Sequence, residues 1–224
     1  MPTVPQLHVP TLAISGSEQR FPVRRIYCVG RNYADHVREM GNDPSRDPPF
    51  FFSKPADAVV GSGRLPFPSR TAELHHEVEL VVALHGGGID VATADAAAMI
   101  FGHAVGIDLT RRDLQAEAKK TGRPWDMAKG FDHSAPIGPL RPGIPPAGGS
   151  ISLSVNGQVR QRGNLEEMIW SVAEIIAALS GFVRLAPGDL IFTGTPAGVG
   201  PIERGDTVRG MIAGTESIEI TFEE

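Results

Sequence analysis

Three acidic side chains, Glu77, Glu79 and Asp108, are of the type that binds a hard divalent cation. Glu77 and Glu79 are two residues apart within residues 74–84, where aliphatic residues alternate with polar ones. This alternation predicts a strand from which both carboxylates project side by side, roughly 7 Å apart at their Cα atoms. Asp108 follows an apolar stretch, where a charge needs a partner. Oxygen ligands of this kind favour Mg²⁺ or Mn²⁺, with Ca²⁺ as a substitute in vitro.

The same spacing also has less specific explanations. Two carboxylates on an edge strand can simply face water, and spacing alone does not exclude this arrangement. Zinc is disfavoured, because His75 and His76 have no third nitrogen or sulfur ligand at regular spacing and do not form the helical His-Glu-x-x-His pattern.

His36 and Glu39 are a second candidate pair, three residues apart in a predicted helix over 32–40. Residues at this spacing share one helix face. A carboxylate that orients a histidine makes it a better base, and such a pair can deprotonate water near neutral pH. An incidental pair on a solvated face is the alternative. Gly41 and Pro44 follow the pair, which suits a segment that becomes ordered when a substrate binds.

Several donors follow the acidic residues along the chain. Arg112 and Gln115 share a face of a predicted helix over 110–120, and Lys129 lies in a predicted loop over 121–131. Together they could donate hydrogen bonds to an oxyanion or a carboxylate beside a metal, although each residue type is individually common on surfaces. A glycine-rich turn over 193–200 lacks the Gly-Lys-Ser/Thr ending of a phosphate loop, so nucleotide binding is disfavoured. Its backbone N–H groups and the Thr195 hydroxyl could instead hold a carboxylate.

The elements that must position these residues are mostly short strands, which the 26 glycines and 19 prolines among 224 residues also suit. We expect an α+β fold with a β-rich core. Asn156-Gly157 predicts a tight hairpin, since both residues tolerate positive φ. The apolar periodicity of residues 164–180 predicts a long helix that Asn164 caps together with Glu167 and that ends at Gly181. Further strands are predicted over 20–30, 74–84, 105–109, 151–155, 159–161, 190–193, 207–211 and 217–222, another helix over 92–100, and a buried aromatic run over 50–52.

Composition narrows the class of protein. The net charge of −5 and the lack of a long basic run argue against nucleic-acid binding. The single cysteine, Cys28, cannot form an internal disulfide and reads as a buried, inert thiol, which favours a reducing, cytoplasmic location. No charged leader followed by an apolar stretch is present, so we expect neither a signal peptide nor a membrane span. We expect residues 1–19 to be a short extension and residues 20–224 to be one catalytic domain.

Five segments also occur in a familiar order. They are Cys-Val-Gly-Arg-Asn-Tyr-Ala-Asp-His at 28–36, Leu-His-His-Glu-Val-Glu-Leu at 74–80, Gly-Ile-Asp-Leu-Thr-Arg-Arg-Asp-Leu-Gln at 106–115, Ala-Lys-Gly-Phe-Asp at 128–132 and Thr-Gly-Thr-Pro-Ala-Gly-Val-Gly at 193–200. In this order they resemble the fumarylacetoacetate hydrolase family over about residues 20–222. The resemblance implies a mixed-sheet β-roll with a few peripheral helices, a homodimer, and the absence of the extra N-terminal domain of the larger members.

The resemblance also implies a role for each candidate residue. Glu77, Glu79 and Asp108 match the metal ligands; His36 and Glu39 match the water-activating dyad; Arg112, Gln115 and Lys129 match the polar cluster around the reacting oxygens; Thr195 matches a contact to the substrate carboxylate. The implied activity is metal-dependent hydrolysis of a carbon–carbon bond in a small 2,4-dioxo acid.

The substrate is narrowed by two further segments. Residues 48–59 and 124–132 resemble those of family members that act on fumarylpyruvate in aromatic catabolism. Acylpyruvate hydrolases that also decarboxylate oxaloacetate share most of the motifs, and an isomerase or hydratase acting on a related dioxo acid is a weaker alternative. A non-catalytic metal-binding scaffold would leave the pairing of His36 with Glu39 unexplained.

Overall fold

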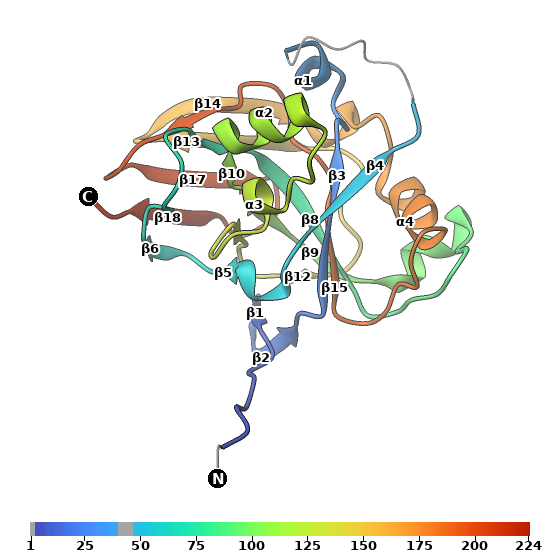
Figure 1. Cartoon of the computed structure of the whole chain (residues 1–224). Coiled ribbons are helices and arrows are strands. Elements are labelled where there is room, and N and C mark those ends of the chain that lie inside the picture. Colours follow the sequence, from blue (N-terminus) through green and yellow to red (C-terminus); the bar gives the residue numbers. More distant parts are fainter. Residues whose placement is uncertain (1–2, 40–46) are drawn as a thin grey trace.

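The computed structural model describes residues 3–39 and 47–224, and most of the predicted loop over 41–49, with Gly41 and Pro44, lies outside these residues. Strands dominate, and two sheets pack face to face with a few helices at the periphery (Figure 1). The predicted α+β, β-rich fold is therefore confirmed.

The larger sheet has six strands and carries Glu79 on one of them. Its spatial order is β12 (Arg141–Pro142), β9 (Ile100–Ile107), β8 (Val78–Leu84), β15 (Asp189–Phe192), β3 (Arg25–Gly30) and β4 (Phe50–Lys54). Only β15 and β3 run parallel; the other neighbours are antiparallel. All seven residues of β8 are buried, because both faces of this sheet are covered.

The second sheet has five strands. Its order is β14 (Gln158–Asn164), β13 (Ser150–Val155), β17 (Thr207–Ile212), β18 (Ile218–Phe222) and β6 (Gly63–Leu65). The predicted hairpin at Asn156-Gly157 is confirmed: it joins β13 to β14, with φ of 50° and 79° at these two residues.

Three small sheets complete the strands. A three-stranded sheet has the order β10 (Thr110–Arg111), β7 (Leu74–His76) and β16 (Gly200–Ile202). Two pairs are formed by β1 (Thr11–Ile14) with β2 (Ser17–Pro22), and by β11 (Ala135–Pro136) with β5 (Val59–Val60). The predicted single strand over 74–84 is thus two strands, which belong to different sheets and are separated by Glu77.

The core consists of two hydrophobic clusters on opposite faces of the six-stranded sheet. Leu80 and Val82 of β8 face the first cluster, which fills the space between the two large sheets. Val81 and Ala83 face the second cluster, which the β1–β2 hairpin helps to cover. Cys28 lies in this second cluster and is fully buried, as predicted, and burial raises the pKa of its thiol. The period-two alternation read from the sequence is therefore correct.

The helices are shorter than the sequence predicts. They are α1 (Ala34–Glu39), α2 (Arg112–Thr121), α3 (Asp126–Lys129) and α4 (Val172–Ser180), with the 3₁₀ turns η1 (Ala56–Ala58), η2 (Thr93–Met99) and η3 (Leu165–Glu167). The predicted α-helix over 92–100 is the 3₁₀ helix η2, and the predicted loop over 121–131 contains the short helix α3. None of the helices in the described residues is long and apolar enough to cross a membrane.

The predicted helix over 164–180 is wrong in its first half. Asn164 does form a capping box with Glu167, but it caps only the short turn η3. A second capping box, formed by Ser171 and Glu174, starts α4. Between the two, the backbone is extended and its N–H groups bond to Asn32, including a 2.7 Å bond from the Trp170 N–H to the Asn32 Oδ1. Tertiary hydrogen bonds thus replace the helical ones in this stretch.

Candidate metal centre and active site

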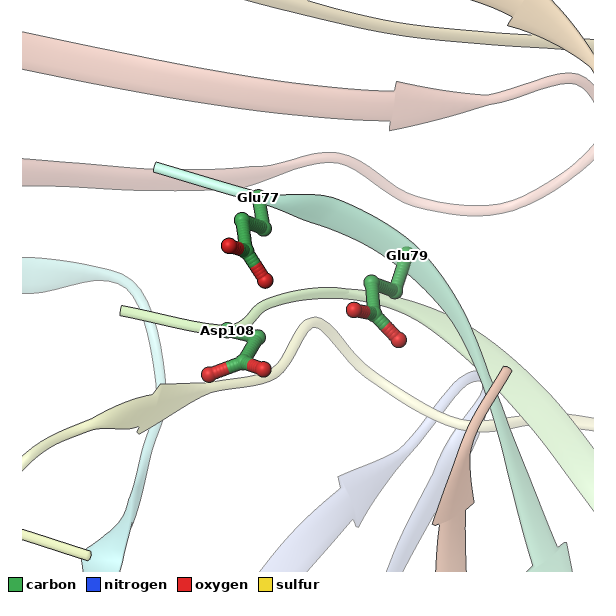
Figure 2. A group of neighbouring side chains, drawn as sticks. All are labelled: Glu77, Glu79 and Asp108. Atoms are coloured by element: carbon green, nitrogen blue, oxygen red, sulfur yellow. The ribbon is translucent and has the colours of Figure 1, made fainter. Parts of the chain in front are cut away.

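Glu77, Glu79 and Asp108 converge at one end of the six-stranded sheet (Figure 2). Glu77 lies in the break between β7 and β8, Glu79 is the second residue of β8, and Asp108 follows β9 directly. One oxygen from each carboxylate lies within 4.8 Å of the others, and all three residues are buried. The alternative that the two glutamates simply face water is therefore excluded.

The backbone fixes this convergence. The Asp108 N–H donates to the Glu77 carbonyl at 2.8 Å, so the two segments that carry the carboxylates are hydrogen-bonded to each other at the site itself. β8 and β9 pair antiparallel, with Glu79 opposite Gly106. The positions of the ligands thus follow from strand pairing, and no loop has to be ordered to create them.

The three carboxylates differ in their electrostatic environment. Burial alone would raise the pKa of Glu77, but the charges of Lys129 and Arg112 outweigh burial and hold this pKa below its ordinary value. Burial, followed by the charges of Asp108 and Glu77, holds the pKa of Glu79 well above its ordinary value. Glu79 accepts a 2.6 Å hydrogen bond from the Gly194 N–H and forms no ion pair with any described residue. Its ionised form therefore lacks a partner.

The donor set fits a divalent cation on two observations. Glu79 is a buried carboxylate beside two like charges, and the buried Asp108 Oδ1 accepts no hydrogen bond from the described residues, although the Lys54 ammonium lies 2.8 Å from it. A cation among the three oxygens would satisfy both groups, and oxygen ligands suit Mg²⁺ or Mn²⁺. Glu77, Glu79 and Asp108 are therefore the residues that can hold the metal.

Two buried lysines lie against the triad. Lys129 donates to Glu77 Oε2 at 2.8 Å, to Asp108 Oδ2 at 2.7 Å and to the Thr110 hydroxyl at 2.6 Å, so all three of its N–H bonds are used. The ammonium of Lys54 lies 2.8 Å from Asp108 Oδ1, in an ionic contact without hydrogen-bond geometry, and donates to the Leu109 carbonyl at 3.1 Å. Lys54 was missed at the sequence level, although it shares strand parity with Phe50 and Phe52 and thus faces the same side.

Arg112 and Gln115 lie beside the triad on α2, as their spacing predicts. The Arg112 guanidinium pairs with Glu77, donates to the Gln115 side-chain oxygen at 2.6 Å and approaches His75 Nδ1 at 3.3 Å. Burial, followed by the charge of Arg112, lowers the pKa of His75 to about 4. His75 is therefore neutral at physiological pH, and Gln115 keeps its amide N–H groups for other acceptors.

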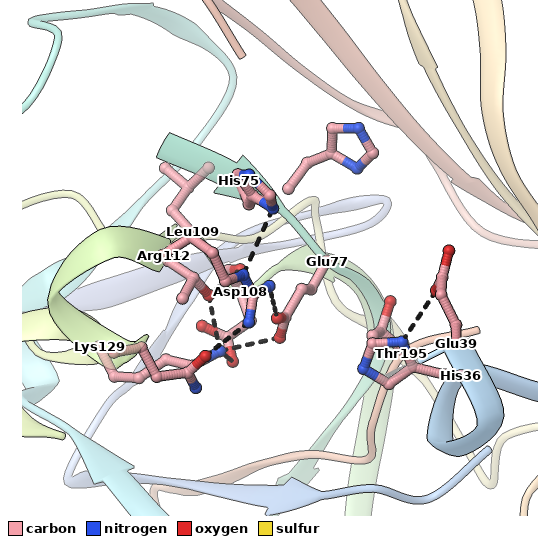
Figure 3. Close-up of polar contacts among 12 residues, drawn as sticks. His36, Glu39, His75, Glu77, Asp108, Leu109, Arg112, Lys129 and Thr195 are labelled. Atoms are coloured by element: carbon pink, nitrogen blue, oxygen red, sulfur yellow. Dashed lines mark hydrogen bonds and ion pairs between the residues drawn. The ribbon is translucent and has the colours of Figure 1, made fainter. Parts of the chain in front are cut away.

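The predicted base and its orienting carboxylate are paired on α1. His36 Nδ1 lies 3.3 Å from Glu39 Oε2, and the His36 side chain is largely buried. Glu39 also accepts the Gly198 N–H at 3.1 Å with each carboxylate oxygen, which ties α1 to the glycine-rich turn. Figure 3 shows this dyad on the opposite side of Glu77 from Lys129. The two predicted groups of residues thus meet across one site.

Thr195 lies in the pocket but its hydroxyl is already engaged. It donates to the Val78 carbonyl at 2.8 Å and accepts from the Gln161 amide at 2.8 Å. In this arrangement the hydroxyl proton is not free for a substrate carboxylate. Gln161, which the sequence did not single out, is fully buried and also contacts His76 Nδ1 at 2.9 Å.

A pocket opens over the triad and the His36–Glu39 dyad, and Glu77, Glu79 and His36 line it. Phe50, Phe52 and Trp125 form its aromatic wall, with Trp125 in edge contact with both phenylalanine rings at 5.5 and 5.8 Å between centroids. The predicted burial of residues 50–52 is only partial: these rings are half-buried, and Phe50 and Phe52 line the pocket. Arg31 and Lys119 also line the pocket.

The chain is similar in sequence and in structure to several known proteins. Residues 25–223 match the family model described as fumarylacetoacetate (FAA) hydrolase C-terminal. The structure of fumarylpyruvate hydrolase from Pseudomonas aeruginosa in complex with Mn²⁺ and pyruvate superposes with a TM-score of 0.96 at 50% identity, covering 100% of this chain and 99% of that one. A fumarylpyruvate hydrolase of Ralstonia sp is 42% identical over 182 residues, which are 80% of this chain and 95% of that protein. An oxaloacetate tautomerase of Escherichia coli is 42% identical over 192 residues, or 83% and 87% of the two chains.

Proposed function

The chain belongs to the fumarylacetoacetate hydrolase family, and from this premise we propose that it hydrolyses the C3–C4 bond of a 2,4-dioxo acid, with fumarylpyruvate as the substrate. The observation that carries the proposal is the placement of the buried carboxylate triad and the His36–Glu39 dyad around one pocket. A bound cation and a base are the two groups that this reaction requires.

The relatives support a division of the pocket. The Pseudomonas aeruginosa structure holds Mn²⁺ together with pyruvate, which is one of the two expected products. We infer that the pyruvyl half of the substrate lies at the triad in this chain as well. The acyl half would then extend toward the aromatic wall formed by Phe50, Phe52 and Trp125.

The mechanism follows from the positions of the side chains. When bound, the cation supplies Lewis acidity to the oxygens of the pyruvyl half. His36, oriented by Glu39, takes a proton from a water molecule, and the hydroxide adds to the C4 carbonyl carbon. Arg112 and Gln115 donate hydrogen bonds to the oxygen that gains charge. Lys129 already donates to Glu77 and Asp108, so it would share this role only after giving up one of these carboxylates.

Bond cleavage then completes the reaction. The C3–C4 bond breaks, and its electron pair stays on C3 to give the enolate of pyruvate. The proton held by His36 is transferred to C3, while C4 becomes the new carboxyl group of fumarate, which ionises at neutral pH. The sum is fumarylpyruvate plus water to fumarate plus pyruvate.

A substrate panel tests the proposal. Purified protein is mixed with Mg²⁺ or Mn²⁺ and with fumarylpyruvate, acetylpyruvate or oxaloacetate, while the absorbance of the dioxo acid is followed and the products are identified by NMR. We expect cation-dependent formation of fumarate and pyruvate that stops in excess chelator and in Glu77→Gln. Full turnover in chelator would remove the metal from the mechanism, and products that retain all the carbon atoms would indicate an isomerase or hydratase.

Oxaloacetate is the basis of a second candidate function, since the Escherichia coli relative is named for its tautomerisation. We infer that the same base and cation could move a proton at C3 of oxaloacetate, or stabilise the enolate left by its decarboxylation, without attack by water. A kcat/KM for oxaloacetate above that for fumarylpyruvate in the same panel would favour this candidate.

Three further inferences concern the whole molecule. We propose that the chain forms a homodimer, that it acts in the cytoplasm and that residues 20–224 are the catalytic unit, with residues 1–19 as an extension. Light scattering on the eluted protein would test the dimer. A variant lacking residues 1–19 that loses turnover would contradict the division of the chain.

A further inference from the structure

Two cationic side chains at the pocket, Arg31 and Lys119, have no assigned role. Neither forms an ion pair with a carboxylate of the described residues. Both are exposed, whereas Arg112 and Lys129 deeper in the pocket are neutralised by Glu77 and Asp108. The outer part of the pocket therefore has a net positive charge that the chain itself does not compensate.

Aromatic rings hold both cations in place. The Arg31 guanidinium carbon lies 5.7 Å from the centroid of Phe50, and the Lys119 ammonium lies 5.2 Å from the centroid of Trp125. Phe50 and Trp125 are themselves in edge contact. The two cations are thus attached to neighbouring parts of one aromatic wall.

The backbone at Arg31 is held in an unusual conformation. Its φ is 62°, in the left-handed region that non-glycine residues rarely adopt. The flanking residues enforce it: the Phe50 ring packs so closely on Gly30 that an added Cβ would lie 1.9 Å from it, and the Asn32 amide donates to the Thr193 carbonyl at 2.7 Å. A strained residue fixed on both sides and lining a pocket points to a functional position.

The electrostatic environment of Lys119 also indicates an excess of positive charge in the outer part of the pocket. Burial, then the charges of Arg112 and Arg31, lower the pKa of Lys119. An anion bound near Lys119 and Arg31 would relieve this repulsion. Since a cation held by the triad would anchor the pyruvyl carboxylate, the anion expected at the outer part of the pocket belongs to the other end of the substrate.

We propose that Arg31 and Lys119 bind a carboxylate at the far end of the acyl chain, so that the enzyme selects dicarboxylic 2,4-dioxo acids over monocarboxylic ones. This inference rests on the proposed function. The flat acyl chain would pass along Phe50 and Trp125 to reach the two cations. Fumarylpyruvate has such a terminal carboxylate at C7, whereas acetylpyruvate ends in a methyl group.

Equilibrium binding of two inert ligands tests the proposal independently of turnover. 2-Oxoheptanedioate and 2-oxoheptanoate both carry the 2-oxo acid end, lack the 4-oxo group that is attacked, and differ only in their terminal carboxylate or methyl group. Each is titrated calorimetrically into the full chain with Mn²⁺. We expect the wild type to bind the diacid about tenfold more tightly than the monoacid.

Two variants and one control locate the effect. Lys119→Gln removes one charge from the exposed face of α2, and Arg31→Asn removes the other with a residue that tolerates positive φ. Each should reduce the preference for the diacid by about threefold or more. Lys120→Gln, the same change on the neighbouring residue outside the pocket lining, should keep it. If Arg31→Asn fails to fold, Lys119→Gln still decides.

The outcomes separate this inference from the proposed function. Equal wild-type affinity for the two ligands, or a full preference retained in Lys119→Gln and in any folded Arg31→Asn, would overturn the inference. A clear preference in a protein that does not hydrolyse fumarylpyruvate would support the carboxylate site and refute the proposed reaction instead.

Discussion

Replacing Glu79 with glutamine should stabilise the metal-free protein and remove its response to divalent cations. The two effects have opposite signs because Glu79 is unfavourable without a cation and needed with one. Its carboxylate is buried beside two like charges, and among the described residues its one hydrogen bond comes from the Gly194 N–H. Glutamine keeps the shape and the side-chain oxygen but removes the charge.

The expected magnitude follows from the distances in the triad. Two unit charges 4.8 Å apart interact by about 3.5 kcal/mol at an effective dielectric constant of about 20. Glu79 has two such neighbours, Glu77 and Asp108, and attraction to Lys129 offsets about one of them. Weakening the charge-assisted hydrogen bond from Gly194 costs about 1–2 kcal/mol. With Glu79 ionised, the net gain in the free energy of unfolding is therefore about 1.5–2.5 kcal/mol, or about 3–10 °C in Tm for a chain of this length.

The pH dependence gives a second signature. The pKa of Glu79 is raised in the folded state, so the folded protein binds this proton more tightly than the unfolded chain does. Its contribution to stability is present below the ordinary glutamate pKa and is lost as the pH rises toward the folded-state value. The advantage of Glu79→Gln over the wild type should therefore grow with pH.

Thermal unfolding with and without Mn²⁺ provides the assay. In chelator, Glu79→Gln should melt above the wild type. With Mn²⁺ at about 100 times its Kd, the wild type should gain about 2.7 kcal/mol and the variant should gain much less. Glu219→Gln, the same change at an exposed position of β18, should change neither value. A metal-free variant less stable than the wild type would refute the repulsion argument, and an unchanged Mn²⁺ response would exclude Glu79 as a ligand.

Three other substitutions test the predicted base, a lysine beside the triad and a buried histidine outside the site. His36→Ala should lower turnover by on the order of 10²-fold or more and keep the Mn²⁺-induced rise in Tm; wild-type turnover would assign the base elsewhere. Lys54→Met should lower the free energy of unfolding in urea by about 3 kcal/mol in chelator, because it leaves Asp108 with a buried charge that has lost a partner, and an unchanged urea midpoint would contradict this. The pKa of His103, whose Nδ1 bonds the Gly143 carbonyl at 3.0 Å, is lowered mainly by burial. The unfolded chain therefore binds this proton more readily, and the free energy of unfolding should fall as the pH drops below the ordinary histidine pKa of 6.5. The free energy of unfolding of His103→Asn should fall less than that of the wild type between pH 7 and pH 5. An equal fall in both proteins would assign the acid sensitivity to other groups.

The features that sequence predicted best are those that depend on local pattern. The alternation along residues 74–84 placed the aliphatic residues on one face and the two glutamates on the other. Asn156-Gly157 placed the hairpin, because strand periodicity and positive φ are properties of a few adjacent residues. The convergence of Glu77 with Asp108 was expected from residue type and family resemblance. Its cause, the pairing of β8 with β9, is a long-range feature that spacing alone does not reveal.

The features that were missed depend on contacts between distant segments. The stretch after Asn164 has the apolar periodicity of a helix, but hydrogen bonds to Asn32, more than 130 residues away, hold part of it extended. Lys54 and the aromatic run beside it belong to an edge strand whose inner side becomes a pocket wall only when α2 and α3 pack nearby. Local propensity reveals neither which stretch tertiary hydrogen bonds hold extended nor which side of a strand meets a ligand.

The hydrogen bond between the Asp108 N–H and the Glu77 carbonyl fixes the position of the carboxylate triad, whereas the outer pocket residues have no such restraint from the centre of the sheet. The three carboxylates are tied to the ends of two central strands, β8 and β9, where any shift would disturb the packing of both large sheets. Arg31, Phe50 and Lys119 lie instead on a turn, an edge strand and an exposed helix face. On the proposed function, substitutions at this periphery would alter which acids bind without moving the three carboxylates.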